Sequence, residues 1–417
     1  SGVMEKLLLL VLLLGASGAA QPQSFEMPLP PAQILPASIA TKLLDADPRV
    51  ESARASLDAA IQEAGIIKRS PYEWIVNGTS QQRRVQGGPN YNEWTAGVER
   101  TIRLPGKSSA DSDISTATLE IAEASYGEAR HEAARELMLA WLDWQAAEEA
   151  RDIAARGVES AKDSLAAVQK RNRAGDASTL DVNIAKAELS DQLRSGNAKV
   201  KATTTWIALT TKFPGVERAR VALPAPVKVT GNDESWTARI IEQSDELRRT
   251  IATARRAEGL SGRARADKIP DPTFGVFTNS EQGNRERIYG VSVSMPIPSR
   301  SRSARYAQAL AQEDATRHDS ALVKRQLTTL ITQNLALAEG AFESYLLAKD
   351  GAQEMETNKS QTQRAYELGE ADLQSLLLAR RQSVSAATTA LEAQVETLKT
   401  NLSLLIDAHW IWDLDHS

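Results

Sequence analysis

Two long stretches of the chain contain no proline. Of the sixteen prolines, none lies between Pro105 and Pro214 and none after Pro298. A proline inside a helix costs about 3 kcal/mol, so proline-free tracts of this length permit very long helices. In the second tract the apolar residues step by three and four along one stripe, at Leu327, Ile331, Leu335, Ala338, Phe342 and Tyr345. This spacing predicts helices that pack along a seam, as in antiparallel or coiled-coil pairs.

The two tracts are related to each other in sequence. Gly175-Asp176-Ala177 in the first tract corresponds to Gly369-Glu370-Ala371 in the second, and other matching residues lie at nearly the same offset. A repeat of this length is far longer than the units of solenoid proteins, which run roughly 20–50 residues. The chain is therefore predicted to be a duplicated half-protein.

Each half is predicted to contain the same elements in the same order. The first repeat, 38–211, holds a helix (38–69), two extended segments (72–83 and 92–103) and a long helical hairpin with its turn at 175. The second repeat, 236–408, holds a helix (236–267), two extended segments (272–281 and 285–297) and a hairpin with its turn at 369. Each hairpin pairs a helix of roughly 65 residues, about 100 Å long, with a returning helix of about 35. Residues 212–235 connect the repeats, and 409–417 form a C-terminal tail.

The first twenty residues have the composition of an export signal. Met4-Glu5-Lys6 precedes an apolar run from Leu7 to Leu14, and small residues follow as far as Ala20. This pattern predicts a secretory signal peptide at 1–20, followed by an N-terminal extended segment at 21–37. A mean hydropathy of −0.35 excludes a bundle of transmembrane helices, and a net charge of −5 argues against nucleic-acid binding. The absence of cysteine excludes disulfides and thiolate metal sites.

The extended segments alternate between apolar and small or polar residues. In the last of them, Tyr289, Val291, Val293, Met295 and Ile297 alternate with Gly290, Ser292 and Ser294. Alternation over about ten residues with aromatic residues near the ends fits a transmembrane β-strand. Four strands cannot close a barrel, and an open edge is not tolerated in lipid, so other copies of the chain would complete the sheet. Two ordinary hairpins on a soluble sandwich remain the alternative.

Local signals predict how the hairpin turns are built. Gly175 and Gly369 supply the left-handed residue that commonly ends a helix. In the first repeat Ser178 and Asp181 form a capping box that starts the returning helix. In the second repeat Asp372 can cap the helix, with Ser375 in place of the partner acid.

No catalytic constellation is found in the sequence. Gly106-Lys107-Ser108 resembles the end of a phosphate-binding loop, but Thr101 stands where that motif requires glycine. The four histidines are not paired at helical spacing and are expected at the surface or at helix ends. We therefore expect a non-enzymatic protein with no cofactor and no tightly bound metal.

In four features together the chain resembles the TolC-type outer-membrane efflux channels. These are the export signal, the duplicated halves, the two Gly-acid-Ala turns, and the strand pairs ending in Leu104-Pro105-Gly106 and Met295-Pro296-Ile297-Pro298. The resemblance implies a mainly helical fold in which long antiparallel hairpins of three chains form an α-barrel across the periplasm. Four strands from each chain would complete a 12-stranded β-barrel in outer-membrane lipid. It also implies a periplasmic adaptor and an inner-membrane, proton-driven pump of the RND type as partners.

Within that family the chain looks most similar to the cobalt–zinc–cadmium resistance branch, so the expected cargo is a divalent heavy-metal cation. A channel for drugs or for type I protein secretion is the alternative within the family, and a periplasmic coiled-coil scaffold without a pore is the alternative outside it. Many relatives carry a lipidated cysteine, which this chain lacks. Its attachment to the membrane would then depend on the barrel alone.

The hairpin turns are the expected periplasmic entrance. Four acidic residues could form cation-attracting rings there: Asp176, Asp181, Glu370 and Asp372. The alternative is that Asp181 only caps a helix and that the others are solvated. Gly175, Gly369, Arg171, Arg173 and Arg364 mark the turns as a docking surface for the adaptor, with ordinary exposed helix charge as the alternative for the arginines.

Overall fold

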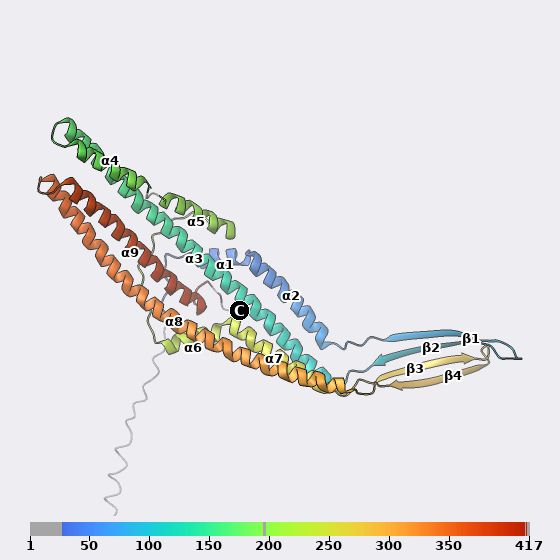
Figure 1. Cartoon of the computed structure of the whole chain (residues 1–417). Helices are drawn as coiled ribbons and strands as arrows, with labels where there is room; N and C mark the ends of the chain where they lie inside the picture. Colours follow the sequence, from blue (N-terminus) through green and yellow to red (C-terminus); the bar gives the residue numbers. More distant parts are fainter. Residues whose placement is uncertain (1–26, 195–196, 413, 415–417) are drawn as a thin grey trace, which may run out of the picture.

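The computed structural model describes residues 27–194, 197–412 and 414, which form an elongated body (Figure 1). Two helical hairpins point to one end of this body, and a four-stranded sheet forms the other end (Figure 1). The expected signal segment 1–20 lies outside the described residues. The fold is mainly helical with a small antiparallel sheet, as the sequence predicts.

Both halves contain their elements in the same order. The first half consists of α1 (Ala37–Asp45), α2 (Pro48–Lys68), β1 (Ile75–Arg83), β2 (Tyr91–Thr101), α3 (Pro105–Arg173), α4 (Thr179–Arg194) and α5 (Ala198–Lys212). The second half consists of α6 (Asp233–Gln243), α7 (Asp245–Ala266), β3 (Thr273–Glu281), β4 (Glu286–Ser294), α8 (Arg300–Glu367) and α9 (Leu373–Asp407). The helices α3 and α8 have 69 and 68 residues, about 100 Å each at 1.5 Å per residue.

The helix expected over 38–69 is divided into α1 and α2, so the expectation of one continuous helix is wrong here. Pro48 occupies the first turn of α2, where its missing N–H is harmless, and it cannot continue the helix before it. Asp47 caps α2, because its carboxylate accepts a hydrogen bond of 2.8 Å from the N–H of Arg49. The sequence Asp-Pro therefore marks a helix start that the periodicity alone does not reveal.

Two further helices are also divided. The helix expected over 236–267 separates into α6 and α7 at Ser244, whose hydroxyl accepts from the N–H of Leu247 at 3.1 Å. The returning helix of the first half consists of α4 and α5, with Asn197 in a turn before α5, whereas the returning helix α9 of the second half is continuous. The two halves therefore differ most in their returning helices.

The two halves meet in a single sheet. Its strand order is β1-β2-β3-β4, and all neighbours are antiparallel. The pairing of β2 with β3, for example Val98 with Val276, joins the first half to the second. Among the described residues β1 and β4 therefore have a neighbour on one side only, and they form the two edges of the sheet.

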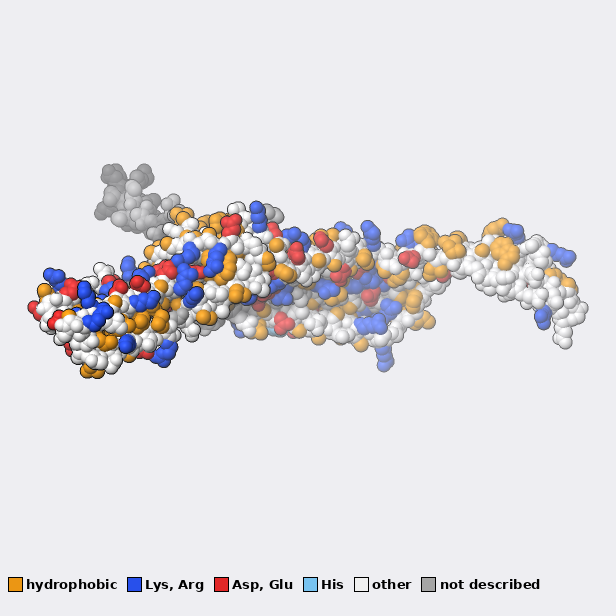
Figure 2. Space-filling model, turned by 90° about the horizontal axis from the view of Figure 1, so that it is seen from above, with side chains coloured by type: hydrophobic (Ala, Val, Ile, Leu, Met, Phe, Trp, Pro, Cys, Tyr) orange, Lys and Arg blue, Asp and Glu red, His pale blue; other side chains and the backbone are white. Residues whose placement is uncertain are grey.

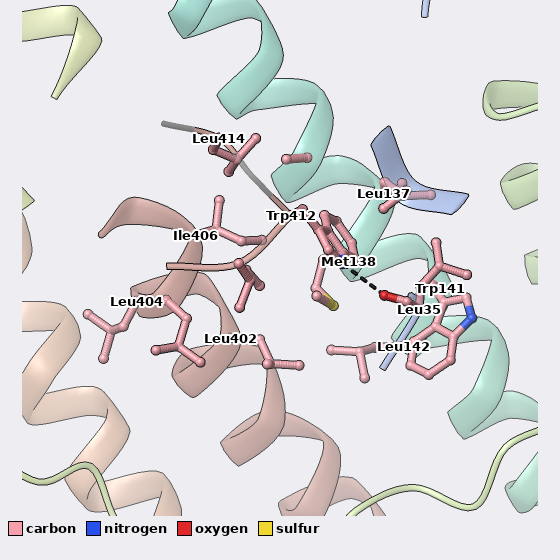
Figure 3. Close-up of a cluster of buried hydrophobic side chains, with 14 of the residues drawn as sticks. Leu35, Leu137, Met138, Trp141, Leu142, Leu402, Leu404, Ile406, Trp412 and Leu414 are labelled. Carbon is pink, nitrogen blue, oxygen red and sulfur yellow. Dashed lines mark hydrogen bonds between the residues drawn. The ribbon is translucent and has the colours of Figure 1, made fainter. Parts of the chain in front are cut away.

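The largest hydrophobic cluster lies near the middle of the helical body, where α1, α3, α5, α6, α8 and α9 converge. Trp144, Leu142 and Leu402 are fully buried in it. Trp412, beyond the end of α9, also packs into this cluster and donates a 2.8 Å hydrogen bond from its indole N–H to the carbonyl of Leu35 (Figure 3). Each large apolar side chain contributes about 1.5–3 kcal/mol on burial, so this cluster holds the two hairpins together.

Candidate functional site: the strand sheet and the hairpin tips

One face of the sheet carries most of its apolar side chains, together with a few polar residues such as Ser80, Thr278 and Arg287. Val76, Val98, Val276 and Val291 are register partners and form a row across all four strands. Their exposed fractions are 78%, 37%, 60% and 80%, so no part of the described chain covers this row. The same face also carries Trp94, Ala96, Phe274, Tyr289 and Val293. A broad exposed apolar face of this kind needs an apolar environment or a partner.

The opposite face of the sheet is mostly polar or small. Its residues include Asn77, Thr79, Gln81, Glu93, Thr95, Gly97, Glu99, Gly275, Asn279 and Ser292, with Ile75, Tyr91, Phe277 and Ile288 as its larger apolar members. The ring of Phe277 lies over Gly290, where a Cβ atom would collide with it. Apolar residues on one face and polar residues on the other match the pattern of a strand between lipid and a watery lumen.

A buried network of ions lies where the strands join the helices. The ammonium of Lys107 is 3.0 Å from Asp271 and 3.3 Å from Asp267. Asp271 also accepts hydrogen bonds from the hydroxyl of Tyr72 at 2.8 Å and from the N–H of Leu104 at 3.0 Å. The side chains of Lys107 and Asp271 are only 3% and 2% exposed. This network ties the start of α3 to the segment that leads into β3.

Two arginines extend the network to the neighbouring helices. Arg103 is 2.8 Å from Asp111 and also donates to the carbonyls of Lys68 and Arg69 at the end of α2, at 3.0 Å each. Arg263 of α7 pairs with the same Asp111. The ends of α2, α3 and α7 are thereby held together at the base of the sheet.

The environment of Asp271 favours its ionised form. Burial opposes ionisation, but the hydrogen bonds from the N–H of Leu104, from Lys107 and from Tyr72 outweigh it and lower the pKa of Asp271. Burial and the same carboxylate raise the pKa of Tyr72, so the tyrosine keeps its proton and remains a donor.

At the opposite end of the body, both hairpin turns are built in the same way. Gly175 and Gly369 have φ values of +87° and +79°, which favour glycine because it has no Cβ. In the first turn the N–H of Asp176 donates to the carbonyl of Arg171 at 2.8 Å, and in the second Glu370 donates to Ala365 at 2.9 Å. With the bonds from the two glycine N–H groups, these form Schellman motifs, which confirms the helix ends predicted at both glycines.

The returning helices begin with the predicted caps. The carboxylate of Asp181 accepts from the hydroxyl and the N–H of Ser178 at 2.8 and 3.0 Å, while the N–H of Asp181 donates back to that hydroxyl at 3.0 Å. In the second half Asp372 accepts from the N–H of Ser375 at 2.7 Å. Hydrogen bonds from the hydroxyl and N–H of Ser375 lower the pKa of Asp372. Two of the four acids proposed for the entrance therefore serve as helix caps.

The two tips contact each other. The guanidinium of Arg171 donates to the hydroxyl of Tyr366 at 2.9 Å and lies 5.6 Å from the centre of its ring. Beneath this contact Val168, Ala185, Leu373 and Leu377 form a small buried cluster shared by both hairpins. One of the arginines expected to face a partner is thus engaged within the chain.

The other residues proposed at the tips lie at the surface. Asp176, Glu370, Arg173 and Arg364 are exposed, and Arg364 comes within 3.7 Å of Glu367. The structure brings all the proposed residues to one end of the molecule, at the two hairpin turns (Figure 1). Their roles in gating and docking remain predictions.

The contacts between the two halves were not predicted from the sequence. Tyr72 and Asp271 are 199 residues apart, and Arg171 and Tyr366 are 195 apart, so both pairs join nearly equivalent positions of the repeat. The repeat offset could have identified them as neighbours across a pseudo-symmetric interface. The histidines were expected at the surface or at helix ends, and His409 lies at the end of α9, where it is 5% exposed and 3.9 Å from Asp245.

Comparisons with known proteins agree with this geometry. Residues 39–212 match the model of a family described as outer membrane efflux protein. No curated protein matches the chain in sequence. The CmeC outer membrane channel of Campylobacter jejuni superposes with a TM-score of 0.74 at 15% identity, covering 91% of this chain and 86% of CmeC.

Two other outer-membrane proteins have the same fold. VceC of Vibrio cholerae gives a TM-score of 0.72 at 15% identity and covers 89% of this chain and 95% of VceC. The open state of the MtrE outer membrane channel of Neisseria gonorrhoeae gives 0.64 at 17% identity and covers 94% of this chain and 96% of MtrE. The family model covers less than half of the chain, at residues 39–212. At these identities the structural likeness establishes the fold.

Two kinds of feature are absent from the described residues. None of the helices there is both long and apolar enough to cross a membrane. No group of three or more histidine, aspartate or glutamate side chains in those residues is arranged to hold a metal ion.

Proposed function

We propose that three copies of the chain form a passive efflux channel, with a 12-stranded barrel in the outer membrane and a helical duct below it. The location is the outer membrane, with the helical body extending into the periplasm. The observation that carries the proposal is the two-faced, open-edged sheet at the end of two long hairpins. Exposed strand edges cannot remain unpaired in lipid, so β4 of one copy pairs with β1 of the next until the barrel closes.

A conductance measurement tests this proposal. Purified protein added to a planar lipid bilayer is expected to produce discrete conductance steps, and to migrate as a trimer in mild detergent. A variant with Val76→Asp and Val291→Asp places charges on the lipid face of both edge strands, where each charge destabilises the inserted strand. We expect that this variant no longer inserts into the bilayer. The matched control, Thr79→Asp and Ser292→Asp, places the same charges on the polar face and should still insert. A wild-type protein that is monomeric and produces no conductance steps would refute the proposal.

The hairpin tips are the proposed gate. Six hairpins from three chains would surround the periplasmic entrance, and the bond from Arg171 to Tyr366 holds the two tips of one chain together. Tyr366→Phe removes the acceptor oxygen and keeps the ring, so we expect more frequent or larger openings. Tyr345→Phe is the control, because Tyr345 is buried in the helical body. If Tyr366→Phe and the wild type have equal conductance, this hydrogen bond does not contribute to gating.

The proposed cargo is a divalent heavy-metal cation, delivered through a periplasmic adaptor by an inner-membrane, proton-driven pump. Support comes from the exposed carboxylates of Asp176 and Glu370 at the tips, because rings of acids lower the potential for cations. Neutralising both, as Asp176→Asn with Glu370→Gln, should reduce cation selectivity in the reversal potential. The control pair, Asp319→Asn with Glu354→Gln, changes exposed acids within α8 that lie outside the turn and should leave selectivity unchanged.

The cargo and the partners need a test in cells. Expression of the chain with a candidate adaptor and pump should raise tolerance to divalent metals. Raised tolerance to drugs with no change for metals would assign the channel to drug export instead. The exposed Arg173 and Arg364 are the proposed docking contacts, and their replacement should lower tolerance without lowering the conductance of the isolated channel.

A further inference from the structure

The segments that join helices to strands carry an unusual charge. Residues 67–74, 99–111, 263–273 and 294–306 together contain eleven lysines and arginines and five acids, a net charge of +6. The whole chain has a net charge of −5, so all other residues together carry −11. The positive charge of the chain is therefore concentrated at the base of the sheet.

The buried ion network does not account for this excess of positive charge. Its three cations, Arg103, Lys107 and Arg263, are matched by its three carboxylates, Asp111, Asp267 and Asp271. The network is therefore neutral by itself. The surplus charge belongs to side chains outside it.

Five of these side chains are exposed, and we call them the basic collar: Lys68 and Arg69 after α2, Arg265 at the end of α7, and Arg300 and Arg305 at the start of α8. None of the five has an ion pair or a side-chain hydrogen bond with another described residue. Figure 1 places the ends of these three helices together where the sheet begins, and Figure 2 shows lysine and arginine side chains (blue) on the body near that end.

The collar adjoins exposed apolar residues at the strand ends. Ile102 after β2 is 46% exposed, and Met295 and Ile297 after β4 are 56% and 92% exposed. A band of apolar side chains followed directly by unpaired cations matches the boundary between hydrocarbon and phosphate headgroups. Trp74, 65% exposed before β1, lies at the same boundary, with the guanidinium of Arg100 5.2 Å from its ring centre.

We propose that the basic collar binds the phosphate headgroups of anionic phospholipids in the leaflet that faces the helical body. This inference depends on the proposed membrane insertion of the sheet. The long side chains of the basic collar lie along the body while their charged ends reach the headgroups. A trimer presents fifteen such cations around its circumference, which selects anionic over zwitterionic lipids next to the barrel.

Trp74 provides the reporter for a test. The variant Trp94→Phe removes the other tryptophan of the strands, and the remaining tryptophans lie in the helical body, outside the bilayer in this account. The trimer is reconstituted into vesicles with brominated phosphatidylcholine or brominated phosphatidylglycerol, and quenching of Trp74 gives the relative binding constant of the two lipids. A preference for phosphatidylglycerol of about fivefold is expected, the equivalent of one basic residue near an anionic surface.

The collar variant exchanges four of the five collar residues, Lys68, Arg69, Arg300 and Arg305, for glutamine and should show a smaller preference for phosphatidylglycerol. The matched control exchanges four exposed lysines of the hairpins for glutamine, at Lys186, Lys199, Lys324 and Lys349, and should keep the preference. Equal binding of both lipids by the protein with a native collar would overturn the collar proposal. So would an undiminished preference in the collar variant. An absence of quenching by either brominated lipid would instead refute the insertion of the sheet, and with it the proposed function.

Discussion

The buried pair of Lys107 and Asp271 allows a sharp test of what holds the sheet onto the helices. Asp271→Asn keeps the size of the side chain but removes its charge, and leaves a lysine that is 3% exposed with Asp267 as its remaining partner at 3.3 Å. Breaking a buried ion pair costs about 3–5 kcal/mol, because the remaining charge is buried without full compensation. Since Lys107 keeps one partner, we expect the lower end, about 3 kcal/mol.

A double-mutant cycle separates the pair from its surroundings. Lys107→Met alone should also cost about 3 kcal/mol, because it leaves the buried carboxylate of Asp271 with only the two neutral donors Tyr72 and Leu104. The double variant Lys107→Met with Asp271→Asn contains neither charge. Its loss should be smaller than the sum of the single losses by about 2 kcal/mol, within the range of coupling energies for contacting residues.

The measurement is urea unfolding followed by circular dichroism at 222 nm, with every variant at the same protein and detergent concentration. Asp113→Asn changes an exposed acid in the same helix and should stay within about 0.5 kcal/mol of the wild type. Additive losses in the cycle would show that the two charges do not stabilise each other. A loss for Asp271→Asn equal to that of the control would show that the network does not hold the sheet.

Three further predictions concern the hairpins and their packing. In urea unfolding, Gly369→Ala should destabilise the second hairpin by roughly 1–2 kcal/mol, because Gly369 has a φ of +79°. The control Gly340→Ala lies inside α8 with open space around its Cβ, and it should stabilise the protein by up to about 1 kcal/mol. Gly259→Ala should cost about 1–3 kcal/mol in the same assay, because its Cβ would meet Ile114 at 2.8 Å, and a neutral result would refute the close packing of α7 on α3. The lowered pKa of Asp372 means that its stabilising charge is present above the ordinary carboxyl pKa and is lost as pH falls through the lower folded value. The protection factors for amide hydrogen exchange at the start of α9, which are corrected for the intrinsic rate at each pH, should therefore fall below about pH 4 in wild type, and less so in Asp372→Asn.

Much of the fold could be predicted because its signals are local and repeated. The proline-free tracts and the seam at Ile331, Leu335 and Ala338 indicate long packed helices, and these three residues are buried in the structure. Gly175 and Gly369 indicate the turns because a left-handed residue strongly favours glycine. Alternation along the strands predicts which side chains share a face, and the registered valine row follows that pattern.

The remaining features depend on contacts that no local pattern encodes. Lys107 belongs to an apparent phosphate-loop fragment, and only the fold brings Asp271 beside it. Arg171 lies in a segment whose sequence is typical of an exposed helix end, but the second hairpin supplies Tyr366 as its hydrogen-bond acceptor. The divisions of the long helices were missed because periodicity continues across a cap. Asp47 and Ser244 each satisfy an N–H group and restart a helix without changing the apolar spacing.

The central claim is that separate chains complete one barrel, and disulfide trapping can test it because the chain has no cysteine of its own. Cysteines at Thr79 and Thr95 provide the positive control, because these two residues are register partners within one chain and should form an intrachain bond. That control shows that oxidation at the level of the sheet is efficient.

The decisive measurement places one cysteine on each edge strand, at Thr79 in β1 together with Ile288 or Ser292 in β4, all on the polar face. After oxidation in membranes, at least one of these pairs should yield covalent dimers and trimers on a denaturing gel. Pairs of Thr79 with Tyr289 or Val291, on opposite faces, should remain monomeric. Monomers for every pair, under conditions that oxidise the intrachain control, would contradict a barrel shared between chains.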